Sequence, residues 1–275
     1  MKLADNPEFI SGVHNYCDRW CERCHLRARC AVFAMEEEDS SESSGRQAAG
    51  GEAGDEAFIK KLGEIFQVTL EMVYEWAEKA GVDLSECDSE EEWAKHEAER
   101  EETREHPLVS DANRYRERVR DWFRLFGSFL GDAEGEAEQD GQAPGTEGQQ
   151  VPKPAPNAEH ADLQESGDII LWYHTLLAAK IGRAVGGKLR CEDADFEDLS
   201  GDSDGSAKVA LIAIDRSMAA WWNLLGHLPE RKREIAGFLA FLNRLRRETE
   251  KTFPLARKFV RPGFDEDSDT SRELE

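Results

Sequence analysis

Residues 162–187, DLQESGDIILWYHTLLAAKIGRAVGG, are the stretch of the chain that most directly predicts its fold. Large apolar residues recur there every three or four positions, which is the period of an amphipathic α-helix. The side chains expected on the buried face of this helix are Ile170, Tyr173, His174, Leu177, Ile181 and Val185. Two consecutive glycines, Gly186 and Gly187, follow the last of them and predict the end of the helix.

The same period appears on both sides of this segment, and no stretch shows the strict alternation expected of a half-buried strand. Further helices are predicted over 58–80, from a cap at Ser110 or Asp111 to Leu130, over 206–226 with Ser206 as cap, and from Pro229 onward. The densely charged residues 85–106 are expected either to form an exposed helix or to stay mobile. The predicted fold class is therefore all-α, an antiparallel four- to five-helix bundle with an N-terminal four-cysteine metal-binding segment and long acidic disordered linkers.

Composition predicts how the chain is divided. Stretches rich in Gly, Ser, Gln, Pro and acids contain too few large apolar residues to form a core, so they are predicted to be disordered. The motif FPLARKFVRPGF, residues 253–264, contains apolar residues that need cover and is predicted to be an ordered extension. The predicted parts are a cysteine segment 7–35, a linker 36–57, a first helical part 58–130, a linker 131–160, a second helical part 161–264 and an acidic tail 265–275.

The chain is strongly acidic, with 58 Asp and Glu against 35 Lys and Arg and a formal net charge of −23. Such a charge repels nucleic acid and anionic membranes, so neither is expected as a partner, and an unidentified protein partner is the remaining expectation. The N-terminal MKLADNPEF lacks the apolar core of a secretory signal, and no apolar run is long enough to span a membrane. These features predict a cytoplasmic protein.

Four cysteines lie within fourteen residues, in YCDRWCERCHLRARC at 16–30. Clustered cysteines in a reducing compartment favour a metal centre over disulfides, and four thiolates can complete a tetrahedral zinc site or hold an iron–sulfur cluster. If the segment is helical, Cys17, Cys21 and Cys24 share one face and Cys30 folds back toward them. The neighbouring arginines, expected to favour the thiolate form, are Arg19, Arg23, Arg27 and Arg29.

The C-x2-C-x5-C part of this motif, CERCHLRARC, resembles the iron–sulfur staples of certain nucleases and of accessory domains of radical enzymes. In those families a fourth cysteine lies elsewhere, and Cys17 is available for that role here. The resemblance implies a [4Fe–4S] cluster, slightly preferred over Zn, held by Cys17, Cys21, Cys24 and Cys30. The C-x3-C-x2-C part also looks like the radical S-adenosylmethionine motif, but that family needs a β/α barrel. The whole chain resembles bacterial helical proteins of unassigned role that share an N-terminal cysteine segment and an RPGF-like ending.

Other candidate sites carry less specific patterns. His14 and His25 are alternative ligands beside the cysteines, and a di-iron bundle site is disfavoured because the Glu-x-x-His pair, Glu22 to His25, lies inside the cysteine segment. His174 is either a general base or a buried histidine satisfied by Asp215, Ser217 or a backbone carbonyl. The remaining candidates are an Asp215–Arg216 pairing with Lys180 or Arg183, a faint calcium loop at Ser200, Asp202, Asp204 and Gly205, and a ribonuclease-like Arg100-x5-His106. A basic region, 229–261, has a net charge of +6 and is expected to face the acidic linkers or solvent, with a phosphate-bearing partner as the alternative.

These observations predict a non-catalytic cytoplasmic helical protein with one metal centre, which responds to oxidation or metal supply or binds a partner. One alternative is an electron-transfer component that uses a [4Fe–4S] cluster. The other is a helical ribonuclease that uses His106 or His174.

Overall fold

The structure is a computed structural model that describes residues 6–44, 90–126, 158–193 and 197–265, with the scattered positions 59, 62–63, 66–67, 70–71, 73–79 and 81. These residues are predominantly helical, and none of them lies in a strand, so the predicted all-α class is confirmed at that level. No helix in this part of the chain combines the length and the apolarity that crossing a bilayer requires. The linker residues 45–57 and 131–157 and the tail 266–275 lie outside the described residues.

The chain divides into two compact units. One comprises Met1–Glu102 with Arg261–Glu275, and the other comprises Thr103–Val260, which we call the helical body. The longer helices are α1 (Ala31–Ser44), α3 (Glu90–Glu105), α4 (Pro107–Phe126), α5 (Ala158–Asp193), α6 (Glu197–His227) and α7 (Lys232–Thr252). Single turns of 3-10 helix are η1 (Val13–Tyr16), η2 (Cys21–Arg23), η3 (Arg27–Arg29), η5 (Pro229–Arg231) and η6 (Ala256–Lys258).

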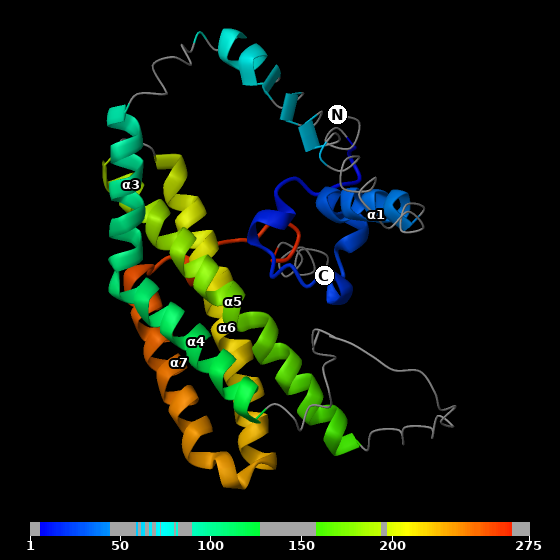
Figure 1. Ribbon diagram of the computed structural model, residues 1–275, viewed down its shortest axis with the longest axis vertical. Helices are drawn as coiled ribbons and strands as arrows, with labels where there is room; N and C mark the ends of the chain where they lie inside the picture. The colour runs from blue at the N-terminus through cyan, green and yellow to red at the C-terminus, as the bar shows by residue number, and fades with distance from the viewer. Residues whose placement is uncertain are drawn as a thin grey trace, which may run out of the picture. The chain divides into compact units, whose positions relative to one another are not determined.

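In the helical body, α4, α5, α6 and α7 pack side by side in a bundle-like arrangement (Figure 1). Helices α5 and α6 are antiparallel, because Asn223 of α6 donates to Ser166 of α5 at 2.8 Å near one end while Arg183 of α5 bonds Asp202 of α6 at 2.7 Å near the other. The predicted face of α5 is buried as expected, apart from His174, which is partly exposed.

Aromatic side chains from three helices form the core at the α6–α7 end of this body. Trp221 is fully buried and stacks on Phe238 with ring centroids 4.2 Å apart and planes 6° from parallel. Trp122 of α4 meets the edge of Trp221 at 5.1 Å. The indole nitrogen of Trp221 donates to the hydroxyl of Tyr115 at 3.1 Å, so the polar atom of each ring is satisfied inside the core.

The glycine pair that predicted the end of the 162–185 helix lies inside α5, so this boundary is wrong. A Cβ atom at Gly187 would lie 2.5 Å from Oγ of Ser203 on α6, and glycine therefore permits the close approach of the two helices. The partner helix also starts early. Helix α6 begins at Glu197 instead of Ser206, and Ser203, from the stretch expected to form an acidic loop, packs against α5.

This helix also removes the candidate calcium loop. Ser200, Asp202, Asp204 and Gly205 are all helical, and Asp202 is paired with Arg183. A helical backbone cannot wrap these oxygens around an ion as a calcium loop does. Burial raises the pKa of Asp204, while Lys188 lowers it.

The other helix boundaries differ from the predictions in detail. Ser110 and Asp111 lie inside α4, whose first turn is capped instead by His106: Nδ1 of that ring accepts the Leu108 amide at 3.2 Å. Residues 36–44, assigned from composition to a linker, continue helix α1. The densely charged 85–106 does contain a helix, α3.

At the described positions of the predicted 58–80 helix, the backbone is helical. Leu62, Phe66, Val73 and Trp76 of the predicted apolar stripe are exposed, and Ala77 is buried.

Candidate metal centre

The cysteine segment is a series of single 3-10 turns, so the prediction that Cys17, Cys21 and Cys24 share a face of one α-helix is wrong. Cys17 follows η1 with extended backbone (φ −93°, ψ 170°), and Cys21 opens η2. Cys24 and Cys30 directly follow η2 and η3, again with extended backbone. Every cysteine therefore lies where the chain changes direction, and all four are partly exposed.

Local contacts explain why this segment is not α-helical. The backbone of Arg19 has a left-handed φ of 58°, which is costly for a residue with a side chain and interrupts any helix between Cys17 and Cys21. The side chain of Asp18 accepts the Trp20 amide at 3.3 Å and stabilises this turn. The amides of Cys24 and Cys30 each bond back three residues, to Cys21 and Arg27, as 3-10 turns require.

Three thiols act electrostatically on the fourth, Cys21. Burial raises the pKa of the Cys21 thiol, the carboxylate of Glu36 raises it further, and the charges of Cys17, Cys24 and Cys30 add to this effect. Mutual repulsion of this kind is expected when several thiolates surround one position without a cation between them. The charges of the three other sulfurs therefore act on the thiol of Cys21.

The net shift of the Cys21 pKa is upward, and three of the arginines expected to favour the thiolate form have other contacts. Arg23 stacks over the ring of Trp20, 3.9 Å from its centroid. The guanidinium of Arg29 donates to the carbonyl of Glu8 at 3.4 Å. Arg19 acts on His14, whose pKa is lowered first by burial and then by that charge.

Among the described residues, no group of three or more His, Cys, Asp or Glu side chains is close enough together to hold a metal ion. The fit of a metal therefore rests on the chemistry of the donor set. Four cysteines match the ligand number and type of all-cysteine zinc sites and of [4Fe–4S] clusters. The backbone carbonyl of His14 accepts the Cys17 thiol at 3.3 Å, and the ring of His25 packs on Phe264.

The two histidines proposed for a ribonuclease both contact backbone atoms near them in sequence. His106 caps α4, as described above, and Arg100 of α3 pairs with Glu97 at 3.9 Å. Nδ1 of His174 lies 2.6 Å from the carbonyl oxygen of Leu171. Of the partners predicted for His174, this contact matches the backbone carbonyl. Burial lowers the pKa of His174, and Arg116 and Arg120 contribute in the same direction.

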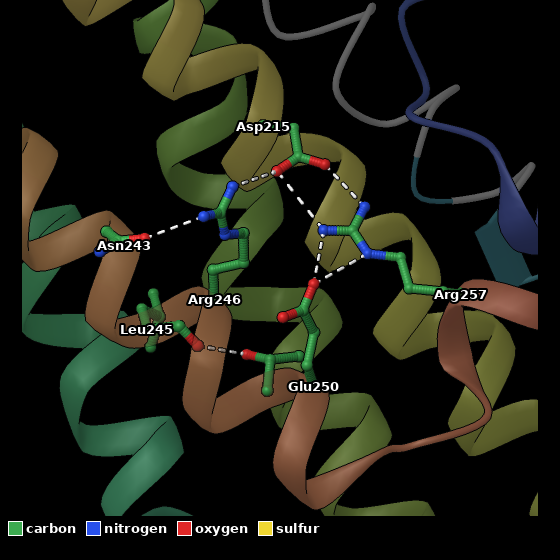
Figure 2. Close-up of polar contacts among 7 residues, drawn as sticks. Asp215, Asn243, Leu245, Arg246, Glu250 and Arg257 are labelled. Atoms are coloured by element: carbon green, nitrogen blue, oxygen red, sulfur yellow. Dashed lines mark hydrogen bonds and ion pairs between the residues drawn. The ribbon is translucent and has the colours of Figure 1, made fainter.

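Asp215 was expected to pair with Lys180 or Arg183, but its partners are Arg246 of α7 and Arg257 of η6 (Figure 2). Arg257 lies between two carboxylates, with Nη1 2.6 Å from Asp215 and Nη2 2.9 Å from Glu250. The hydrogen bond to Asp215 raises the pKa of Arg257. The neighbouring Arg216 bonds the hydroxyl of Tyr173.

We expect Arg257→Ala to lower the free energy of unfolding by no more than about 1 kcal/mol, since ion pairs of partly exposed side chains are screened by water. The side chains of Arg257 and Asp215 are 42% and 40% exposed. Urea denaturation followed by circular dichroism measures the change, with Lys258→Ala as the matched control on the same turn. A loss above about 2 kcal/mol would contradict this weak contribution.

The basic region 229–261 places several of its cations on its own helical body. Arg231 covers the ring of Phe126 at 3.7 Å, and Arg244 pairs with Asp111 of α4 at 3.5 Å. With Arg246 and Arg257 on Asp215, four of its cations are bound by side chains of the helical body. The expected pairing with the acidic linkers is not needed to explain these four.

No protein-family model matches the chain, and neither curated proteins nor solved structures gave a match.

Proposed function

We propose that Cys17, Cys21, Cys24 and Cys30 bind one metal centre, a [4Fe–4S] cluster slightly in preference to zinc, in a non-catalytic helical protein of the cytoplasm that responds to redox state or metal supply or binds a protein partner. The observation that carries the proposal is that each cysteine lies at the start or end of a 3-10 turn, with the other three thiols near enough to act electrostatically on Cys21. Burial and Glu36 contribute most to the raised pKa of Cys21, and a cation among the thiolates would relieve the repulsion that adds to them.

The small core of this segment supports the proposal as well. Between residues 6 and 36, the buried apolar side chains in the described part are those of Val13 and Leu26. Two side chains bury too little surface to offset the ordering of some thirty residues, and small units of this kind are usually stabilised by a metal or by disulfides. When bound, an iron–sulfur cluster would supply one-electron redox chemistry, and zinc would supply folding energy.

The first test is metal and sulfide analysis of protein purified without oxygen, with the visible spectrum recorded alongside. We expect about four irons and four sulfides per chain, and the loss of both in Cys24→Ser. Cys191→Ser is the matched control, because Cys191 lies on α5, outside the cysteine segment, and we expect it to keep the centre.

If the parent holds about one zinc per chain and Cys24→Ser loses it, the four proposed ligands stand and the centre is a structural zinc ion instead of a cluster. A parent protein without metal, or a Cys24→Ser variant that keeps it, would remove the proposal.

A further inference from the structure

We propose that the C-terminal turn Arg261–Asp265 is a clamp that holds the cysteine turns in place, so that retention of the metal depends on it. This inference rests on the proposed function for its metal readout, and on geometry alone for the clamp. We call the described residues Asn6–Glu36 together with Arg261–Asp265 the cysteine module; both stretches belong to the same compact unit.

The first contact of the clamp is made by Gly263, whose backbone is left-handed with φ 71°. A Cβ atom built on it would lie 2.7 Å from Cδ1 of Ile10 and 3.3 Å from Cδ1 of Leu26. Leu26 is one of the two buried apolar side chains of the segment and lies between Cys24 and Cys30. Glycine is therefore needed both for the conformation and for the space.

Ile10 connects this contact to the next cysteine. Its amide donates to the carbonyl of Arg29 at 3.0 Å, and Arg29 directly precedes Cys30. Gly263 of the turn thus packs against Ile10, whose hydrogen bond to Arg29 lies next to the proposed ligand Cys30. Displacing Ile10 would loosen the backbone that positions Cys30.

The second contact is made by Phe264, whose ring meets that of His25 at 5.8 Å and 87°. His25 directly follows Cys24, so this edge-to-face contact fixes the chain next to a second proposed ligand. The guanidinium of Arg261 also lies over the ring of Phe264, 4.8 Å from its centroid, and holds that ring within the turn.

Hydrogen bonds within the turn Arg261–Asp265 hold its conformation, as a clamp requires. Arg261 donates from Nε and Nη2 to the two carboxylate oxygens of Asp265 at 3.1 and 3.0 Å, and its amide donates to the same carboxylate at 2.9 Å. These side chains are only 16% and 22% exposed, so the pair is better shielded than the surface ion pairs of the helical body.

The chain that precedes the clamp is fixed within the helical body. Phe253 and Ala256 are buried there, and Lys208 of α6 donates to the carbonyl of Phe259. Only Val260 separates this anchored residue from Arg261. The clamp therefore follows directly on an ordered stretch of chain.

The experiment compares Gly263→Val and Phe264→Ala with Val260→Ala, a matched control on the same stretch of chain whose side chain is 58% exposed. Full-length proteins are loaded under the conditions that load the parent, and release of metal to a chelator is timed. We expect release to be about tenfold faster in Gly263→Val, several-fold faster in Phe264→Ala, and unchanged in the control. Circular dichroism confirms that the helical body of each variant is folded.

A second readout, the rate at which a thiol reagent modifies the metal-free cysteines, keeps the two proposals separate. We expect the metal-free cysteines of both clamp variants to be modified faster than those of the parent, whether or not the parent binds metal. Metal in the parent but equal release and equal thiol rates in all variants would overturn the clamp and leave the proposed function standing. No metal in the parent, with faster thiol modification in the variants, would overturn the proposed function and support the clamp.

Discussion

Trp221→Ala is expected to lower the free energy of unfolding of the helical body by about 3–5 kcal/mol, whereas Trp222→Ala should change it by less than about 0.5 kcal/mol. The two residues are neighbours in sequence and identical in type, but Trp221 is fully buried and the side chain of Trp222 is 69% exposed. Removing the first indole deletes the stack on Phe238 and leaves a cavity beside Trp122. It also removes the donor to the buried Tyr115 hydroxyl.

Urea denaturation of both variants, followed by circular dichroism, measures the difference. Since domains are stable by only about 5–15 kcal/mol, the Trp221→Ala protein is expected to begin unfolding at much lower urea concentrations. Trp221→Phe keeps an aromatic ring and should lie between the parent and the alanine variant. Equal losses at Trp221 and Trp222 would show that this aromatic cluster is not the core of the body.

Alkaline pH should destabilise the helical body through Tyr115. Burial raises the pKa of this phenol to about 12, against an ordinary value of 10.0. The folded state therefore binds the phenolic proton more tightly than the unfolded state, and the resulting stability is fully present below pH 10. It is lost progressively as the pH rises from about 10 to about 12, by at most about 2–3 kcal/mol.

The measurement is the urea midpoint of the parent and of Tyr115→Phe between pH 8 and pH 12. We expect the parent to lose stability more steeply above pH 10, so that the two curves converge. The phenylalanine variant lacks the acceptor for the Trp221 indole, so it starts from a lower stability. Parallel curves across the whole range would contradict a raised pKa at Tyr115.

Periodicity predicted the elements of the helical body well because a buried helical face leaves a direct record in sequence. Ile170, Tyr173, Leu177 and Ile181 are all buried on the predicted side of α5. Gly187 misled the prediction because glycine serves two purposes, ending helices and allowing them to approach closely. Only the position of Ser203 on the neighbouring helix distinguishes the two, and that position is a property of the folded chain.

The sequence indicated which residues could form the candidate site, but it did not indicate how the backbone arranges them. Spacing suggested that Cys17, Cys21, Cys24 and Cys30 act together, and the structure keeps their charges within reach of Cys21. The turn at Arg19 overrides the helical spacing, and a left-handed backbone at arginine has no sequence signature. The role of Gly263 and Phe264 depends on contacts across more than two hundred residues, and the sequence predicted only an ordered extension there.

The cysteine module joins residues 6–36 to residues 261–265, which has a consequence for the order of events during synthesis. The cysteines leave the ribosome first, but the glycine that packs on Ile10 and Leu26 is translated more than two hundred residues later. Until then the thiols are exposed to oxidants and to competing metal ions without the clamp. The module can close only after Asp265 has emerged, and under the two proposals above metal binding would be completed as a late, post-translational step.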